Sequence, residues 1–147
     1  MDGTGIETSI TGMFKITLIK ASAFTKPWMG KLDFPLGERA DDWIVHSFTK
    51  RDYLETFSSN PGDIYGASSI DEAMMNTYTT TRAFVMDEYG LTYDEANTII
   101  TQGVDFGMTQ LVDGNWGVHG IVPKAIFADA ARRRLHEKKI AAAAAAA

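Results

Sequence analysis

Two helix-start signals follow one another in the middle of the chain, and they constrain its fold more than any other feature. Residues 69–72 (Ser-Ile-Asp-Glu) and 92–95 (Thr-Tyr-Asp-Glu) both place a hydroxyl three positions before a carboxylate, so each side chain can satisfy a free backbone N–H group. Apolar residues recur at helical spacing over residues 70–85, and Gly90 is a natural helix end. The second helix is expected to end near Gln102. The pattern predicts two helices joined in an α-hairpin.

Segments with the period of β-strands lie on both sides of the predicted helices. Residues 5–20 alternate apolar and polar side chains, which predicts a long half-buried strand, and residues 43–48 (WIVHSF) predict a short one. Two more strand-like segments lie within residues 103–127, around a tight turn at residues 113–115 (Asp-Gly-Asn). Pro123 suits the first turn of a terminal helix. This order predicts an α+β fold, in which a mixed or antiparallel β-sheet packs with the α-hairpin and a C-terminal helix.

The length and composition favour a single domain. A chain of 147 residues with 45% apolar side chains can bury one core, and we expect this domain to span residues 1–140. Residues 141–147 are all alanine and are interpreted either as a helical tail or as unassigned positions. A net charge of −5 argues against nucleic acid and anionic membranes as partners, because both bind clustered Lys and Arg. The basic cluster within residues 132–139 predicts a solvated helix face.

The chain contains no cysteine, which removes several kinds of chemistry. Disulfides, thiolate metal ligands and a cysteine nucleophile are excluded. The nitrilase-like route to amide hydrolysis, which depends on a catalytic cysteine, is excluded with them. The sequence has no apolar run of about 18 residues, and its first residues lack the basic and hydrophobic parts of a signal peptide. These features predict a cytoplasmic protein.

Polar side chains gather within residues 103–127, at the predicted turn between two strands. Polar groups on a loop held by a rigid scaffold are typical of a site rather than a core. Asp105 and Asp113 fall on one side of a strand by their even spacing, so they could share a metal or divide acid and base work. The alternative is that Asp113 caps the turn and Asp105 is exposed. Gln110 and Asn115 could orient an amide, because each offers both a donor and an acceptor.

The remaining candidates are two imidazoles, a carboxylate and an indole. None of the three histidines has a spacing typical of metal ligands. His46 alternates with apolar residues and is interpreted as a satisfied, partly buried side chain, with a ligand or catalytic role as the alternative. His119, beside the turn, is a candidate catalytic residue. Glu7 is either a solvated charge at a strand edge or a group directed into a cleft, and Trp116 is expected to form a pocket wall.

Two stretches resemble the acetamidase/formamidase family. The opening GTGIETSITGMFKITLIKA (residues 3–21) is similar to a strand of that family, and VDFGMTQLVDGNWGVHGIVPKAIF (residues 104–127) resembles its C-terminal signature. The resemblance covers about residues 3–127. It implies an amidohydrolase that converts formamide, acetamide or a similar short-chain amide to a carboxylate and ammonia. It also implies the C-terminal half of a larger β-rich enzyme, jelly-roll-like in its first half and α/β in its second, that forms homo-oligomers.

The resemblance further implies where the metal and its ligands lie. The family carries an Asp/His-containing stretch and a GDGE motif before the region matched here. A divalent metal ion, zinc or calcium, is therefore expected to find its ligands largely outside this chain. A missing N-terminal portion or a partner chain would supply them. We accordingly expect a large exposed apolar surface on the strand over residues 5–20, including Ile6, Ile10 and Phe14.

These observations lead to a hypothesis of metal-assisted amide hydrolysis. Glu7 is expected to act as general acid/base, while Asp113 and His119 line or support the site. These groups are expected to converge near Glu7 around a small pocket. The substrate-binding residues are expected to be Gln110, Asn115 and Trp116. The alternative is a non-catalytic fragment or interaction module that keeps the fold but lacks the active half.

Overall fold

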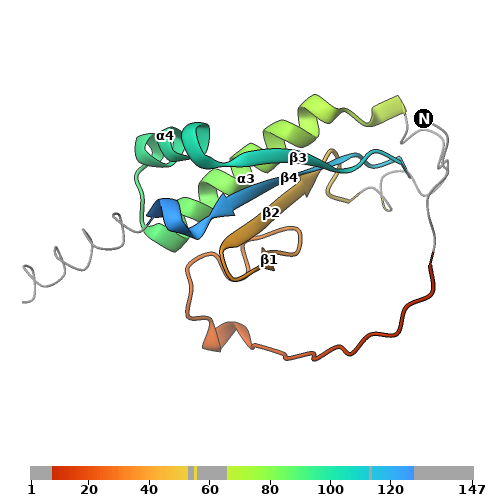
Figure 1. Ribbon diagram of the computed structural model, residues 1–147, viewed down its shortest axis with the longest axis horizontal. Coiled ribbons are helices and arrows are strands. Elements are labelled where there is room, and N and C mark those ends of the chain that lie inside the picture. The colour runs from red at the N-terminus through yellow and green to blue at the C-terminus, as the bar shows by residue number, and fades with distance from the viewer. Residues whose placement is uncertain (1–7, 53–54, 56–65, 113, 128–147) are drawn as a thin grey trace, which may run out of the picture.

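A four-stranded antiparallel sheet with two helices on one face forms the body of the protein (Figure 1). The computed structural model describes residues 8–52, 55, 66–112 and 114–127. The strands run in the order β1-β2-β4-β3. They are β1 (Gly37–Glu38), β2 (Asp42–Phe48), β3 (Asp105–Gln110) and β4 (Gly117–Pro123), and the helices are α3 (Ile70–Tyr89) and α4 (Tyr93–Gly103). The predicted α+β fold, with an antiparallel sheet packed against an α-hairpin, is confirmed.

Local capping explains where both helices begin. The Ser69 hydroxyl accepts a hydrogen bond from the Glu72 N–H (3.3 Å), and Gly90 ends α3 with a left-handed backbone, φ 60°. At the start of α4 both halves of the capping box form. The Glu95 N–H donates to the Thr92 hydroxyl (3.4 Å), and the Thr92 N–H donates to the Glu95 carboxylate (2.9 Å). The helix positions follow from groups adjacent in sequence, which is why the sequence predicts them well.

The core lies between the two helices and one face of the sheet. In β2 the side chains alternate, and Trp43 and Val45 are buried toward the helices. Phe84 of α3 packs edge-on against Trp43, with ring centroids 5.4 Å apart. The Thr77 hydroxyl of α3 also donates a hydrogen bond to the Val118 carbonyl of β4 at 3.0 Å. The helices therefore close this face of the sheet, and a site must lie on the other face or at an edge.

The prediction of a strand over residues 5–20 is wrong for residues 8–20, the part of this segment that the structure describes. Residues 8–20 form no strand or helix, and none of the four strands of the sheet pairs with them. A strand needs a neighbour for its N–H and C=O groups, and an alternating sequence does not supply one. The predicted exposure is confirmed for Ile10 (83%) and Phe14 (86%), while Ile6 lies outside the described residues. Residues 8–20 form an extended segment of alternating apolar and polar residues, the N-terminal arm, that runs apart from the sheet (Figure 1).

The connection between β3 and β4 is longer than the predicted tight turn. β3 ends at Gln110 and β4 begins at Gly117, and the register shifts between Met108 and Gln110. Gly114 has a φ of 82°, the positive value that the turn prediction requires. Asp113 lies outside the described residues. The shift leaves Thr109 of β3 without an opposite partner on β4, and residues 111–116 connect the two strands.

The chain after β4 also differs from the prediction. Pro123 is the last residue of β4, opposite Asp42, and does not open a helix. A short 3₁₀ helix, Lys124–Phe127, follows. The predicted C-terminal helix beyond it and the alanines at residues 141–147 lie outside the described residues. In the part of the chain that is described, no helix has the length and apolar character needed to cross a membrane.

Candidate functional site

The candidate site lies on the sheet face that points away from α3 and α4, called here the open face. Strand alternation places Ile44, His46 and Phe48 of β2 on this face, where they are half-buried. The antiparallel register sets His46 directly opposite His119 of β4, and Ile44 opposite Ile121. Residues that are directly opposite point to the same face. Two imidazoles that are far apart in the sequence are thus neighbours on the open face.

A cavity of about 440 Å³ covers this part of the open face. Its polar groups are the two imidazoles, the Thr109 hydroxyl and the Arg39 guanidinium. Arg39 is also held by both carboxylate oxygens of Asp42, at 2.7 and 2.9 Å. The apolar lining consists of Pro35, Leu36, Ile44 and Ile121. A few polar groups among apolar walls are typical of a small-molecule site.

The His119 ring is held by β3. Its Nδ1 lies 2.8 Å from the Thr109 hydroxyl, so Nδ1 is engaged and Nε2 is the nitrogen left for chemistry. Gly107 lies directly opposite His119 and leaves room for the ring. A Cβ at residue 107 would lie 3.1 Å from both Cε1 and Nε2, so the ring would have to move by a few tenths of an ångström. The glycine and the threonine together determine the orientation of the imidazole.

His46 is the more enclosed of the two imidazoles. Its ring lies between Phe34 and Phe48, with centroid distances of 6.1 and 5.7 Å. Its Nδ1 is buried and has no hydrogen-bond partner among the described residues. Burial lowers the pKa of His46, the Pro35 carbonyl offsets part of this shift, and the neighbouring His119 lowers the pKa further. His46 is therefore neutral at neutral pH and keeps a free nitrogen lone pair.

We expect the stability of the protein to depend on the protonation of His46. Because its pKa is lowered on folding, the unfolded chain binds more protons between the folded pKa and the ordinary value of about 6.5. The free energy of unfolding should be constant above this window, decrease as the pH falls through it, and level off below it. Denaturant unfolding across this range measures the decrease, and His46→Gln should make it shallower. An NMR titration in which His46 titrates above its ordinary pKa would contradict the prediction.

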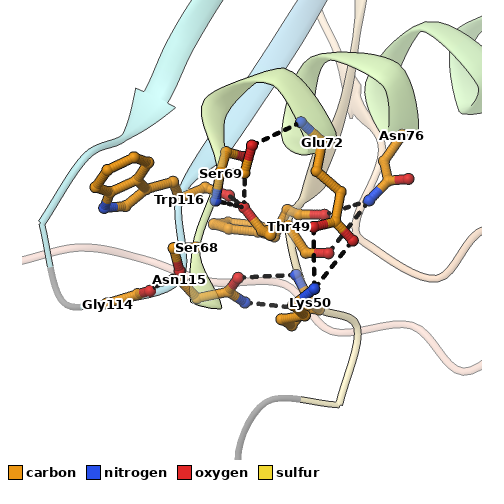
Figure 2. Close-up of polar contacts among 10 residues, drawn as sticks. Thr49, Lys50, Ser68, Ser69, Glu72, Asn76, Gly114, Asn115 and Trp116 are labelled. Carbon is orange, nitrogen blue, oxygen red and sulfur yellow. Dashed lines mark hydrogen bonds and ion pairs between the residues drawn. The ribbon is translucent and has the colours of Figure 1, made fainter. Parts of the chain in front are cut away.

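Asn115 has a structural role in this geometry. It is 6% exposed, its Oδ1 accepts a hydrogen bond from the Lys50 N–H (3.0 Å), and its Nδ2 donates to the Lys50 carbonyl (2.8 Å). Figure 2 shows these bonds beside the first turn of α3, where the Ser68 hydroxyl donates to the Gly114 carbonyl and the Lys50 ammonium pairs with Glu72 (3.0 Å). Both amide atoms of Asn115 are in use, so binding an amide substrate there would require these bonds to break.

Replacing Asn115 by alanine is expected to reduce the free energy of unfolding by about 1–3 kcal/mol, because the backbone N–H and C=O of Lys50 lose their partner. Denaturant unfolding followed by circular dichroism measures this change. Gln102→Ala, an exposed position in α4, is the control and should change stability by no more than about 0.5 kcal/mol. Equal stability of the two variants would show that the Asn115 bridge contributes nothing.

Of the other predicted site residues, the three that the structure describes do not line the cavity with His119. Gln110, at the end of β3, donates from Nε2 to the Val112 carbonyl (2.8 Å). Trp116 is half-buried, and its carbonyl accepts a hydrogen bond from the Thr49 N–H (2.8 Å). Glu7 and Asp113 lie outside the described residues, so their predicted roles stay predictions. Among the described site residues, His119 alone lines the cavity, and the predicted convergence of Asn115 with it is not observed.

The sequence did not identify Thr109 and Arg39 as site residues. It favoured a satisfied, partly buried role for His46 over a catalytic one. The sequence contains one usable signal, because even spacing places Thr109 on the same side of β3 as Asp105 and therefore on the open face. Asp105 itself is exposed, opposite Ile121. Nothing in the sequence indicates that β2 pairs with β4. The proximity of His46 to His119 therefore required the structure.

The described residues offer only part of a metal site. They contain no group of three or more His, Asp or Glu side chains placed to hold an ion. The orphaned, buried Nδ1 of His46 and the partly engaged ring of His119 form the nearest donor set. These two imidazoles do not by themselves make a metal site, so the ligands of the divalent ion that the resemblance implies would lie outside the described residues.

Comparisons with known proteins assign no family. No protein-family model matches the chain, and no curated protein matches it.

Proposed function

We propose that the chain is the C-terminal portion of an amidohydrolase that converts short-chain amides, formamide or acetamide, to a carboxylate and ammonia. The observation that carries the proposal is the pairing of His46 with His119 in an apolar-walled cavity of about 440 Å³. A short-chain amide has a small alkyl group that suits such walls and a polar head that suits the imidazoles. The resemblance of residues 104–127 to the acetamidase/formamidase signature supports the same reaction, as part of a cytoplasmic homo-oligomer.

The roles of the residues follow from their environment. His119 would serve as a general base through Nε2, because Thr109 holds Nδ1. The proton that His119 takes from the attacking water would pass to the amide nitrogen as the C–N bond breaks and ammonia leaves, and His46, neutral at neutral pH, would line the site as a hydrogen-bonding group. Glu7 would contribute as a general acid/base, and Asp113 would support it. A bound divalent metal ion, zinc or calcium, would polarise the amide carbonyl and lower the pKa of bound water.

Ammonia release from formamide and from acetamide tests this proposal. The chain would be assayed alone and as isolated together with any polypeptide that copurifies with it, each with and without a chelator. Ammonia release that stops on chelation supports metal-assisted hydrolysis. Release that is insensitive to the chelator would remove the metal from the mechanism. No release from either preparation would overturn the proposal.

The second candidate is a non-catalytic interaction module, and one observation favours it. The N-terminal arm exposes Met13 by 99%, Ile16 by 94% and Leu18 by 86%. Several large apolar side chains exposed close together in the sequence commonly mark a protein interface. A stable complex with a second polypeptide, without amide hydrolysis by the complex, would support this candidate over the enzyme.

A further inference from the structure

We infer that a second cavity, at the end of the sheet where α3 ends and β2 begins, is a binding site for a small aromatic carboxylate (Figure 1). This cavity has a volume of about 510 Å³ and is called here the aromatic cavity. It is separate from the cavity of the open face, because the two share no lining residue. The inference goes beyond the proposed function, since no group assigned to amide hydrolysis takes part in it.

Four aromatic rings form the walls of the aromatic cavity. The rings of Trp28 and Trp43 meet edge to face, with centroids 6.2 Å apart and planes at 67°. Tyr89, the last residue of α3, stacks on Phe127 with a centroid distance of 3.7 Å. The Trp43 Nε1–H donates to the Tyr89 hydroxyl (3.1 Å), which joins the two pairs. A ligand ring can contact both faces and edges of these walls, the two arrangements that aromatic pairs prefer.

One side of the rim is built around an enclosed carboxylate. The side chain of Glu88 is 10% exposed, and its two oxygens accept from the Lys26 ammonium and from the Trp28 Nε1–H, each at 2.6 Å. Hydrogen bonds to an ionised group are stronger than neutral ones, so they hold the indole and the lysine in place. Both Glu88 oxygens already have a donor. An ammonium carries three N–H groups, so Lys26 keeps two of them for a ligand.

The other side of the rim carries Lys124 and Tyr89. The Lys124 ammonium donates to Glu38 (2.8 Å) and to the Arg39 carbonyl (2.7 Å), and it lies 4.6 Å from the centroid of the Trp43 ring. One of its three N–H groups remains. The Tyr89 hydroxyl accepts from Trp43, so its own O–H is available as a donor. Burial raises the pKa of Tyr89, which keeps the hydroxyl protonated at neutral pH.

The hydrogen-bonding capacity that remains at the rim therefore favours an acceptor. Lys26, Lys124 and Tyr89 supply N–H and O–H groups, while both glutamates of the lining already have a lysine partner. A carboxylate accepts such bonds on both oxygens, and its bonds to ammonium groups are charge-assisted. A ligand cation would instead meet two ammonium groups. A flat ring that bears a carboxylate matches both the walls and the rim, whereas a carboxylate without a ring matches the rim alone.

Titration of the whole 147-residue chain with benzoate, followed by tryptophan fluorescence, tests the site, because Trp28 and Trp43 form its walls. We expect saturable binding with a dissociation constant in the millimolar range or below, the scale for a ligand of this size. Benzylamine has the same ring with a cation, and acetate has the carboxylate without the ring. Each should bind roughly tenfold more weakly than benzoate, or not at all. No saturable binding of benzoate, or equal binding of benzylamine or acetate, would overturn the inference.

Two pairs of variants assign the binding to the aromatic cavity. Tyr89→Phe keeps the ring and removes the O–H, and Lys26→Met keeps a side chain of similar length and removes the ammonium. Each should weaken benzoate binding roughly tenfold, the usual scale for a hydrogen bond to a charged group. The controls are Tyr93→Phe, on α4, and Lys15→Met, on the N-terminal arm, which replace exposed side chains and should leave binding unchanged. Wild-type affinity in both Tyr89→Phe and Lys26→Met would refute the site.

NMR of the wild-type chain keeps the test decisive if a variant fails to fold. Intermolecular nuclear Overhauser effects should join the ring protons of bound benzoate to the indole protons of Trp28 and Trp43. Effects that reach only His119 and Ile121, on the open face, would overturn the aromatic cavity as the site. Because no amide is present, a negative result here refutes the carboxylate site without bearing on ammonia release.

Discussion

Replacing His119 by glutamine is expected to lower the kcat for formamide hydrolysis by roughly 100-fold or more, the scale on which a general base contributes. Glutamine keeps a polar side chain of similar length but cannot take up a proton at neutral pH. The Nε2 of His119 is the nitrogen that Thr109 leaves free, and the ring lies in the wall of the cavity. Steady-state kinetics of ammonia release, in whichever preparation of the protein is active, measures the effect.

The pH dependence distinguishes a catalytic His119 from a merely structural one. A general base gives a limb in the pH–rate profile, and this limb should disappear in His119→Gln while the folded protein persists. His136→Gln is the control and should keep both the rate and the profile. An unchanged kcat in a folded His119→Gln variant would assign the chemistry to groups outside the described residues, such as Glu7.

Replacing Phe84 by alanine is expected to reduce the free energy of unfolding by about 3–5 kcal/mol, the usual cost of emptying an aromatic core position. Phe84 is 1% exposed and joins α3 to the sheet. Its ring lies 5.7 Å from the ring of Trp28 and 5.4 Å from that of Trp43, so truncation leaves a cavity among rigid rings that cannot collapse easily. Denaturant unfolding followed by tryptophan fluorescence measures the loss.

Met75, on the same helix, provides the matched control. It is 65% exposed, so Met75→Ala should change stability by no more than about 0.5 kcal/mol. A loss below about 1 kcal/mol for Phe84→Ala would mean that neighbouring side chains fill the space left by the ring, and that other contacts hold α3 against the sheet.

The sequence by itself determined the elements whose causes are local. Ser69 and Thr92 bond to the first turn of the helix that follows them, and Gly90 supplies the left-handed residue that ends α3. These interactions join residues close in sequence, so the pattern alone predicts both helices. The strand-like residues 43–48 were recognised for a related reason, since their alternation directs Trp43 and Val45 toward the core.

Residues 8–20 show the limit of such patterns. They have the alternation of a half-buried strand, but Ile10 and Phe14 are exposed and no strand of the sheet pairs with the segment. An alternating pattern indicates which side chains would be buried if the segment had a partner strand and if a helix or second sheet packed on its apolar face. It does not create the partner, which must come from elsewhere in three dimensions.

The candidate site was predictable in part. His119 was identified from the polar residues around the turn, and the structure places it in the cavity. Asn115 was predicted to bind substrate from the same segment. It instead hydrogen-bonds the backbone N–H and C=O of Lys50, which follows the end of β2. Only the tertiary structure decided that β2 pairs with β4 and that His46 faces the same cavity as His119. Strand pairing depends on how distant segments share hydrogen bonds and a core, and this information is spread over the whole chain rather than held in any local motif.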